Sequence, residues 1–454
     1  MKVMKFGGGC LKSEKSFAQV AAIIRAEKVR PVVVVSAVSG VTDFLLESIL
    51  GAEKSEKNIR GCLRALKERH AGLVKKIMRN ERIRQETIKR LEAGLKKVEK
   101  LLTGIAYTGE ATAATRACVL SYGERLAAII LAAFLRDRGM ESQSLESDKI
   151  GLVTDDNLEN ATVDLEEFKK NFVSTARFIR QSKAIPVITG FFGRTPEGKV
   201  STFGRNGTDY SAAVVAYGLA ASELEIWKDV DGFMSADPKL VASARKIDRL
   251  SYYEAAELSY FGAKILHPRT LEPLHGLKIS VVIKNLWQPE SPGTKILPNG
   301  YVKNDIIKSV TCNKQIALLR IHGPGVGYKP GIIGQVGSKL SAAGVNIYSI
   351  ITSQTCINLL VDKKDARRSF EALEDMTGGV IERIDLEEDV TLIAAVGEGL
   401  RTQKGLAARM FSAVSKANVN VEMISSGASE VASYFIVDKA DTEKAITALH
   451  REFF

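Results

Sequence analysis

The sequence predicts an α/β protein: a three-layer α/β/α sandwich around a mostly parallel sheet, followed by two ferredoxin-like units. Over the first 290 residues, short apolar runs rich in β-branched residues alternate with longer stretches of helical period. This alternation is typical of parallel sheets covered by helices on both faces. At 454 residues, the chain exceeds the size at which one hydrophobic core stops growing. Beyond residue 305, one order of expected elements occurs twice, which indicates a duplicated unit.

The expected strands of the first part are short and apolar, and they cover residues 2–6, 31–36, 185–192, 223–227 and 278–284. Helical period is clearest over 13–28 and 123–138. The first two strands end in glycine turns with the sequences KFGGG and VSAVSG. Open α/β sheets bind ligands at the carboxyl ends of their strands, so we expect a ligand at these turns.

The C-terminal part begins after Trp287, where proline and glycine gather in QPESPGTKILPNG. The order strand, helix, strand, strand, helix then runs from Ala317 and again from Thr391. This predicts two βαββα units of ferredoxin-like type. Residues 306–312 and 379–384 are the candidates for one further strand in each unit, and the two units can exchange strands. A duplicated small module of this kind is more often regulatory than catalytic.

The net charge of +11 comes mainly from residues 53–100, where 16 Lys or Arg residues and 7 Glu residues leave +9. Apolar residues in this segment are spaced to form one buried helical stripe, so we favour a solvated basic face. A surface that attracts anionic substrates such as ATP and an RNA-binding surface are the alternatives. The segment has no interleaved aromatics or nucleic-acid motif, and we expect no nucleic-acid partner.

The five cysteines are far apart and form no CxxC pair, which favours neither a zinc site nor a disulfide framework. A reducing cytoplasm fits this usage. No signal sequence and no run of about 18 uncharged apolar residues is evident, so we expect a soluble protein without a membrane partner. His267 and His275 read as turn residues, and we expect no protein-held metal.

Two glycine-rich motifs carry charge. KFGGGC places Lys5 before three glycines and a helix that starts near Ser13. Amides exposed at such a turn bind phosphate, although tight packing explains the turn equally well. STFGRNGTDYSAAVVAYG, followed by ELEIWKDVDGFMSADPK, places Arg205, Asp209 and Lys228 in turns beside apolar runs. Asp209 falls at the start of a helix, where capping is the alternative to a role in chemistry.

Six segments together resemble, in the same order, the motifs of aspartate kinases: KFGG, VVVVSAVSGVTD, LSYGERLAA, TFGRNGTDYSAA, WKDVDGFMSADPK and LSYYEAAELSYFGAKILHPRT. The resemblance runs over nearly the whole chain. It implies an amino acid kinase fold for residues 1–290 and ACT domains for residues 305–385 and 386–454. It also implies a homo-oligomer formed through the ACT domains.

The resemblance implies transfer of the γ-phosphoryl group of ATP to the β-carboxylate of L-aspartate, which gives 4-phospho-L-aspartate for the biosynthesis of lysine, threonine and methionine. The implied cofactor is ATP with Mg²⁺ held mainly by the nucleotide phosphates. An ionised carboxylate is already a nucleophile, so this chemistry needs alignment and charge neutralisation more than a base. The alternatives are another amino acid kinase, acting on glutamate or acetylglutamate, and an amino-acid sensor with a decayed kinase domain.

The resemblance also assigns residues. The catalytic residues are Lys5, Asp209 and Lys264. The residues for ATP and its phosphates are Lys5, Gly7, Gly8, Gly9, Lys228, Asp229, Met234, Asp237, Lys239 and Lys264. The residues for aspartate are Ser36, Thr42, Glu124 and Arg205, of which Arg205 suits bidentate contact with a carboxylate and Glu124 suits an ammonium. The residues for an amino acid effector are Gly331, Ile332, Asn346 and Ile347.

The chain departs from the family pattern at several positions. Gly9 and Cys10 stand where most aspartate kinases have Thr and Ser, which removes two hydroxyls from the phosphate turn but keeps its amides. We therefore expect activity to survive. Asn206 and Thr208 replace Gly and Ser, and Asn adopts the left-handed conformation less readily than Gly. Tyr348 replaces the acidic residue of lysine-inhibited relatives, which favours threonine, another effector or no feedback.

Overall fold

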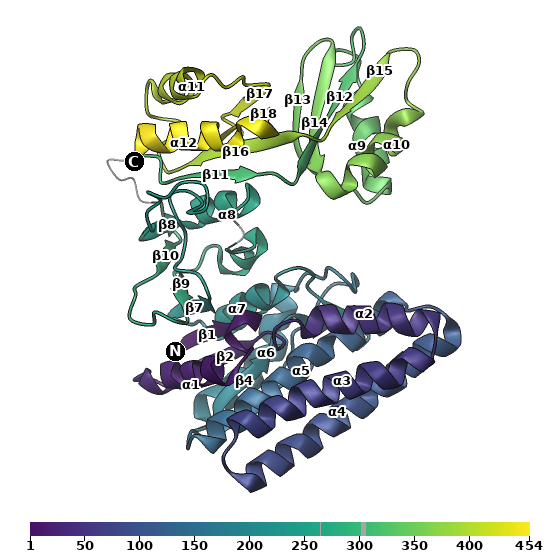
Figure 1. Ribbon diagram of the computed structural model, residues 1–454, viewed down its shortest axis with the longest axis vertical. Helices are drawn as coiled ribbons and strands as arrows, with labels where there is room; N and C mark the ends of the chain where they lie inside the picture. The colour runs from purple at the N-terminus through teal and green to yellow at the C-terminus, as the bar shows by residue number, and fades with distance from the viewer. Residues whose placement is uncertain (264, 301–305) are drawn as a thin grey trace. The chain divides into compact units, whose positions relative to one another are not determined.

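The computed structural model describes residues 1–263, 265–300 and 306–454, and the chain forms two compact units (Figure 1). Unit 1 comprises Met1–Phe233, Asp248–Tyr252 and Ile265–Gly300. Unit 2 comprises Met234–Ile247, Tyr253–Lys264 and Tyr301–Phe454.

Unit 1 is built on an eight-stranded sheet in the order β3-β4-β2-β1-β7-β9-β10-β8. Every neighbouring pair is parallel except β9 with β10, so the sheet is mostly parallel as predicted. The strands are β1 (Lys2–Phe6), β2 (Val32–Val35), β3 (Ser142–Leu145), β4 (Ile185–Thr189), β7 (Glu223–Lys228), β8 (Arg249–Ser251), β9 (Ser280–Asn285) and β10 (Thr294–Leu297).

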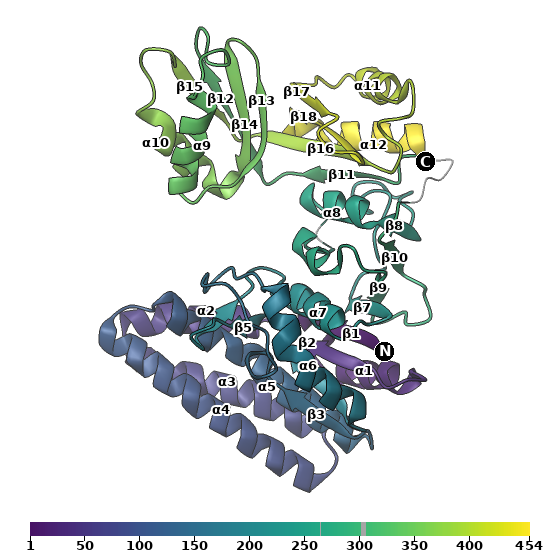
Figure 2. The ribbon, with the colours of Figure 1, turned by 180° about the vertical axis from the view of Figure 1, so that it is seen from behind.

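Helices cover both faces of this sheet, as both ribbon views show (Figures 1 and 2). Alternate residues of β1 face opposite sides. Met4 and Phe6 join a core cluster that includes residues of α1 and α5, whereas Lys5 points to Asp209 on α7. The helices of unit 1 are α1 (Glu14–Ala26), α2 (Val41–Lys54), α3 (Lys57–Ile77), α4 (Glu81–Thr108), α5 (Ala113–Asp137), α6 (Leu165–Gln181) and α7 (Gly207–Gly218).

The predicted strand 185–192 is interrupted. β4 ends at Thr189, and a short hairpin of β5 (Phe192–Arg194) and β6 (Val200–Thr202) follows it. The chain turns at Gly190 and Phe191, and Phe191 adopts a positive φ of 73°. A Cβ at position 190 would lie 2.3 Å from the Thr208 methyl carbon, so only glycine fits there. The break carries Phe191 to the carboxyl edge of the sheet.

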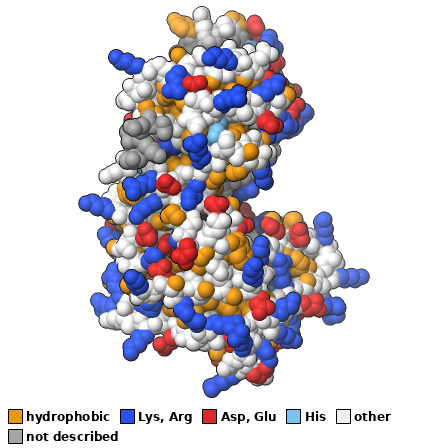
Figure 3. Space-filling model, turned by 60° about the vertical axis from the view of Figure 1, so that its left-hand side comes forward, with side chains coloured by type: hydrophobic (Ala, Val, Ile, Leu, Met, Phe, Trp, Pro, Cys, Tyr) orange, Lys and Arg blue, Asp and Glu red, His pale blue; other side chains and the backbone are white. Residues whose placement is uncertain are grey.

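The basic segment forms the antiparallel helices α3 and α4. Its predicted apolar stripe is in the core, with Leu66, Leu91, Leu95 and Val98 buried. Most of its Lys and Arg side chains are exposed. On the face shown in Figure 3, Lys and Arg side chains are interspersed with Asp and Glu side chains. These observations agree with a solvated face.

Of the described helices, α5 is the one that is long and apolar enough to cross a membrane by length and composition. It is a core helix here, since 78% of its apolar window is buried inside the protein. Its Phe134 ring packs edge to face on Phe17 of α1, with the ring centroids 5.7 Å apart.

Unit 2 contains the two repeats, each with a four-stranded antiparallel sheet. The first sheet has the order β13-β14-β12-β15, and the second has the order β11-β16-β18-β17. The first repeat comprises β12 (Ile316–His322), α9 (Ile332–Ala342), β13 (Ile347–Thr352), β14 (Cys356–Asp362), α10 (Ala366–Glu374) and β15 (Arg383–Glu387). The second comprises β16 (Val390–Val396), α11 (Leu406–Lys416), β17 (Met423–Ser426), β18 (Ala432–Asp438) and α12 (Thr442–Phe453).

The strand β11 (Ser309–Asn313) precedes the first repeat in the sequence but pairs with β16 of the second, with Val310 opposite Ala395. The range 305–385 predicted for the first ACT domain therefore includes a strand of the second sheet. In the first sheet, β12 already pairs with β14 on one side and with β15 on the other. In the second sheet, β16 pairs with β18 on one side, so its other side is available to β11. The first repeat is thus inserted into the second.

The helix α8 (Tyr252–Tyr260) lies mostly in unit 2, although the sequence assigned it to the kinase domain ending at 290. Its Glu254 forms an ion pair of 2.8 Å with Lys308 and accepts the Glu398 N–H at 2.7 Å. The hydroxyl of Tyr260 donates to the Tyr348 carbonyl at 3.2 Å. Contacts with both repeats therefore hold this helix in unit 2.

Candidate active site

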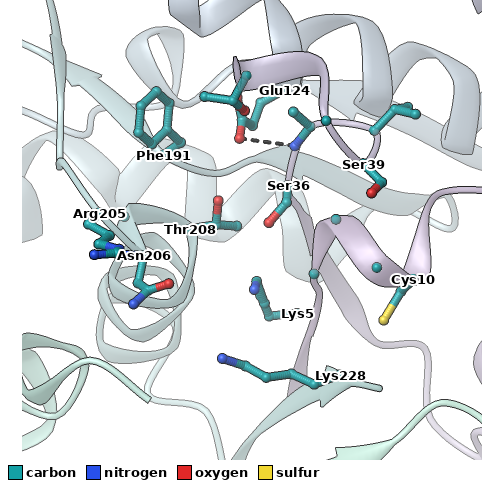
Figure 4. A pocket seen from close by; sticks show the side chains of 18 of the residues that line it. Lys5, Cys10, Ser36, Ser39, Glu124, Phe191, Arg205, Asn206, Thr208 and Lys228 are labelled. Carbon is teal, nitrogen blue, oxygen red and sulfur yellow. Dashed lines mark hydrogen bonds between the residues drawn. The ribbon is translucent and has the colours of Figure 1, made fainter. Parts of the chain in front are cut away.

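A cavity of about 480 Å³ opens at the carboxyl edge of the sheet of unit 1 (Figure 4). The turns after β1, β2 and β7 supply part of its lining, and the amino end of α7 and one side chain of α5 supply more. The predicted site residues that line it are Lys5, Gly7, Gly8, Gly9, Ser36, Thr42, Glu124, Arg205, Lys228 and Asp229. The structure thus brings together residues that are up to 224 positions apart in the chain.

Asp209 is buried beneath the cavity and does not line it, but it pairs with two lysines that do. Its Oδ1 lies 2.6 Å from Lys5 Nζ, and its Oδ2 lies 3.0 Å from Lys228 Nζ. Burial opposes ionisation of Asp209, but the two ammonium groups outweigh burial and lower its pKa to about 2. A single carboxylate thus holds two positive charges side by side. Because its carboxylate pairs with the two lysines, helix capping is not needed to explain an Asp at position 209.

The glycine turn after β1 is a short 3₁₀ helix over Gly8–Cys10. The Gly7 N–H, which we expected to contact phosphate, donates instead to the Trp227 carbonyl at 3.2 Å. The amides of Gly8 and Gly9 open the 3₁₀ turn, and neither donates a hydrogen bond to a described residue. They are the better candidates for phosphate contact.

Gly9 and Cys10, the departures from the family pattern, each have a structural setting. A Cβ at Gly9 would lie 3.4 Å from Asp229 Oδ2, which is ordinary contact. The Cys10 thiol donates to the Trp227 carbonyl at 3.3 Å. Burial of the Cys10 side chain raises its pKa to about 11, so it is a protonated thiol at neutral pH.

Glu124 reaches the cavity from α5 and is fully buried. Its Oε1 accepts the Ala37 N–H at 3.0 Å (Figure 4), and its Oε2 has no hydrogen-bond partner among the described residues. Burial raises the pKa of Glu124 to about 8. The close approach of α5 to the turn after β2 depends on Gly123, because a Cβ there would lie 2.8 Å from Ala37 Cβ. A buried carboxylate with one oxygen left over suits a ligand that brings an ammonium group.

Arg205 and Asn206 are exposed at the mouth of the cavity, and Thr208 is buried beside them. Asn206 precedes α7 in the left-handed conformation, with a φ of 58°. Asn is among the residues that adopt this conformation most often after glycine. The replacement of glycine at this position therefore keeps the turn.

Some of the predicted residues lie elsewhere. Lys264 is outside the described residues. Met234, Asp237 and Lys239 belong to unit 2 and do not line this cavity. Asp237 accepts the Lys239 N–H at 2.9 Å, which is a local turn. The assignment of these three residues to ATP rests on the resemblance alone.

The predicted effector residues lie in the first repeat of unit 2. Gly331 precedes α9 with a φ of 93°, and Ile332 begins that helix. Asn346 immediately precedes β13, and Ile347 begins that strand. Tyr348, the departure noted in the sequence, packs its ring on Tyr260 of α8 at 5.0 Å between centroids. The assignment of these residues to an effector stays a prediction.

The structure adds residues that sequence reasoning missed, namely Ser39, Asp43, Phe191 and Thr208. Phe191 had a detectable signal, because it follows an apolar strand and a glycine in the same way as the first two turns. Ser39 lies in the turn after β2, and Asp43 and Thr208 lie in the first turns of α2 and α7; residue spacing does not show that these positions meet at one cavity.

The comparisons with known proteins agree with the fold. The sequence model of the amino acid kinase family matches residues 1–285. Models of ACT domains match residues 311–375 and 393–453. A mostly parallel sheet with cations and free amides at its carboxyl edge is an arrangement with which α/β proteins commonly bind phosphate. The chain belongs to the aspartokinases, within the amino acid kinase family.

Among its relatives, aspartokinase 1 of Arabidopsis thaliana chloroplasts is 30% identical over all of this chain and 80% of its own length. The bifunctional aspartokinase/homoserine dehydrogenase of Haemophilus influenzae is 32% identical, and the match covers this whole chain and 56% of that protein. The chain spans about half the length of the bifunctional relatives that it matches. The structure of E. coli aspartokinase III with aspartate and ADP matches all of both chains, with 26% identity and a TM-score of 0.84.

Proposed function

We propose that the chain is an aspartate kinase that transfers the γ-phosphoryl group of ATP to the β-carboxylate of L-aspartate. The products are 4-phospho-L-aspartate and ADP. The observation that carries the proposal is that one cavity is lined by Lys5 and Lys228, which the buried Asp209 pairs, and by Glu124 with its unsatisfied oxygen. The similarity to aspartokinases over the whole chain supports the choice of substrate.

The phosphoryl end of the cavity suits charge neutralisation. In the proposed step, an oxygen of the β-carboxylate forms a bond to the γ-phosphorus while the bond to the bridging oxygen of ADP breaks. Negative charge on the transferring group is stabilised by the ammonium groups of Lys5 and Lys228 and by the amides of Gly8 and Gly9. Asp209 holds the two ammonium groups in place.

The aspartate end of the cavity suits an amino acid. We assign the α-ammonium to Glu124 and the α-carboxylate to Arg205, whose planar guanidinium can contact two oxygens at once. Ser36 and Thr42 line the same cavity and supply hydroxyls for further contacts. Because Glu124 is fixed by the Ala37 N–H, the ammonium is held at a constant place relative to the turn after β2.

The residues fit a Mg²⁺ ion held mainly by nucleotide phosphates. The described residues contain no group of three or more His, Cys, Asp or Glu side chains that could hold a metal ion. Mg²⁺ typically binds through one or two carboxylates together with water and phosphates, and Asp43 and Asp229 both line the cavity. When bound with ATP, the ion would supply charge neutralisation of the phosphates.

We also propose that an amino acid regulates the enzyme through the repeats of unit 2 and that these repeats form a homo-oligomer. The support is the pair of ACT domains and the similarity to E. coli aspartokinase III, which was solved in a complex with lysine and aspartate. Tyr348 offers no counter-ion for a lysine side chain. This favours threonine or another amino acid over lysine as the effector in the synthesis of lysine, threonine and methionine.

Trapping of the acyl phosphate with hydroxylamine tests the proposed substrate. Purified chain is incubated with ATP, Mg²⁺, hydroxylamine and one of three acceptors: L-aspartate, L-glutamate or N-acetyl-L-glutamate. We expect hydroxamate with L-aspartate only. Hydroxamate with another acceptor would indicate a different amino acid kinase, and no hydroxamate at high protein concentration would favour a sensor with a decayed kinase domain.

A further inference from the structure

We propose that a second cavity in unit 1 binds a small anion with an aromatic body, and that its occupancy alters the binding of aspartate. The cavity has a volume of about 400 Å³ and lies between α4, α5 and the short helix at Ser147–Lys149. The proposed effect on aspartate binding rests on the proposed function, whereas the proposed binding of an anion in the second cavity does not. The lining includes Arg90, Lys97, Tyr122, Arg125, Glu146 and Asp148.

The charges of this cavity favour an anion. Arg125 is almost buried and lies 2.7 Å from Asp148 and 2.5 Å from Glu146, and Lys149 lies 2.6 Å from Glu146. The two acidic side chains are thus matched by two basic ones. Arg90 donates to the neutral Ser144 hydroxyl at 3.0 Å, and no described carboxylate lies within ion-pair distance of Arg90 or Lys97. Two positive charges are left for a ligand, in a cavity that also has low-dielectric walls.

The rest of the lining favours a ligand with an apolar body. The ring of Tyr122 and the side chains of Leu126 and Ile129 form one wall, and Ala93 and Gly94 face them. A Cβ at Gly94 would lie 3.0 Å from Leu126 Cδ2, so glycine lets α4 pack closely against the apolar side of α5 here. The cavity is larger than a phosphate ion needs and has the size of a small-molecule site.

The second cavity and the active site are connected through two pairs of residues that are adjacent in the sequence. Glu124 lines the active site, and its neighbour Arg125 lines the second cavity. Phe191 lines the active site, and the ring of its neighbour Phe192 lies 4.5 Å below the Arg125 guanidinium. A ligand that draws Arg125 toward itself therefore acts on the backbone that places Glu124 and Phe191.

A second connection runs through the segment that carries both acidic residues. Ser147, between Glu146 and Asp148, donates its N–H to the Thr189 hydroxyl at 2.8 Å. Thr189 is the last residue of β4, directly before the turn at Gly190 and Phe191. A change in the pairing of Arg125 with these acids thus reaches the active-site turn through one hydrogen bond. The geometry assigns the second cavity to regulation rather than to chemistry.

The binding test uses phenyl phosphate as the probe, with inorganic phosphate and benzoate as comparison probes, in titration calorimetry of the full chain. The variant Arg90→Gln with Lys97→Gln removes both unpaired charges. Its matched control is Lys89→Gln with Lys96→Gln, which makes the same charge change at the same helical spacing on exposed positions outside the cavity. Circular dichroism confirms that both variants are folded.

We expect the wild type and the control to bind phenyl phosphate alike and the Arg90 and Lys97 variant to bind it at least tenfold more weakly. Inorganic phosphate should bind less tightly than phenyl phosphate, since it leaves the Tyr122 wall unused. Benzoate distinguishes a carboxylate ligand from a phosphate ligand. The absence of binding by the wild type, or equal weakening in both variants, would overturn the site.

The regulatory part is tested by the KM for L-aspartate, with and without phenyl phosphate. We expect a change of about fivefold or more in the wild type, which is the lower end of typical coupling between sites, and no change in the Arg90 and Lys97 variant. Binding without any change in KM would refute the coupling. A chain that binds the probe but never phosphorylates aspartate would contradict the proposed function and leave the site standing.

Discussion

At the scale of single residues, Asp209 decides how the charges of the cavity are arranged. Its two oxygens pair with Lys5 and Lys228, which come from two neighbouring strands. The sequence predicted that Asp209 lies at the start of a helix near a glycine turn, and the family motif indicated a role in chemistry. The pairing itself spans 204 residues to Lys5, and no local pattern reveals a contact at that separation.

We predict that Asp209→Asn lowers kcat by about 10²-fold or more, the scale of losing one preorganised electrostatic contact. Without the carboxylate, the two neighbouring ammonium groups repel each other and move apart. The hydroxamate assay with L-aspartate measures the rate. Asp156→Asn, on an exposed loop, is the matched control and should keep full activity. A variant at Asp209 as active as this control would show that the cluster is not part of the site.

The pH dependence of stability at Asp209 has a definite sign. Its pKa is lowered to about 2 in the folded chain, while an unfolded Asp has a pKa near 3.9. The stabilisation from this group is therefore present above about pH 4 and is lost as the pH falls toward 2. Acid titration followed by circular dichroism should show a smaller loss of stability below pH 4 in Asp209→Asn than in the wild type.

Glu124 predicts a pH dependence of substrate binding. Its pKa is raised to about 8 by burial, so the free enzyme at pH 6 holds the carboxyl protonated. An aspartate α-ammonium binds the ionised form, and the KM for L-aspartate should therefore fall as the pH rises from 6 toward 8. Glu124→Gln should raise the KM and remove this dependence. Steady-state kinetics at several pH values provides the measurement, and an unchanged profile in the variant would rule out Glu124 as the ammonium site.

At the scale of elements, the helix α8 shows where the motif and the fold differ. The sequence placed it in the kinase domain because its motif follows the kinase motifs in order. In the structure, Glu254, Tyr260 and Phe261 contact the repeats of unit 2. These contacts join residues 54 to 173 positions apart, so motif order along the chain does not predict them. Strands and helices with strong periodicity were predicted well, since their signal is local.

We predict that Glu254→Gln destabilises the chain by about 3 to 5 kcal/mol, the usual cost of breaking one side of a buried ion pair. Glu254 is fully buried and Lys308 nearly so. The double variant Glu254→Leu with Lys308→Met should recover part of the loss, because neither charge then remains buried. Thermal unfolding of the three proteins provides the measurement. A double variant less stable than Glu254→Gln would contradict this explanation.

At the scale of the whole chain, the duplicated C-terminal unit was visible as a repeated order of elements, but the partner of the strand at Ser309–Asn313 was not. Local pattern shows that a segment is a strand, whereas the choice of partner depends on which sheet edge is free. Because β11 completes the second sheet, the chain cannot be divided between the repeats at residue 385 without exposing β16.

We therefore predict that a fragment of residues 306–454 is folded and that a fragment of residues 386–454 is not. The shorter fragment lacks β11 and leaves the apolar strand β16 as an open edge, which favours aggregation. Size-exclusion chromatography and circular dichroism compare the two fragments. A monodisperse, cooperatively unfolding shorter fragment would show that β11 is dispensable.

The central claim is that one cavity in unit 1 binds the phosphates of ATP at Lys5 and the amino acid at Glu124. The most direct test is the rate of β-aspartyl hydroxamate formation from ATP and L-aspartate, measured side by side for the wild type and Lys5→Ala. The account predicts hydroxamate with the wild type and a rate at least about 10²-fold lower in the variant. An equal rate in both proteins, or no product from the wild type, would contradict it.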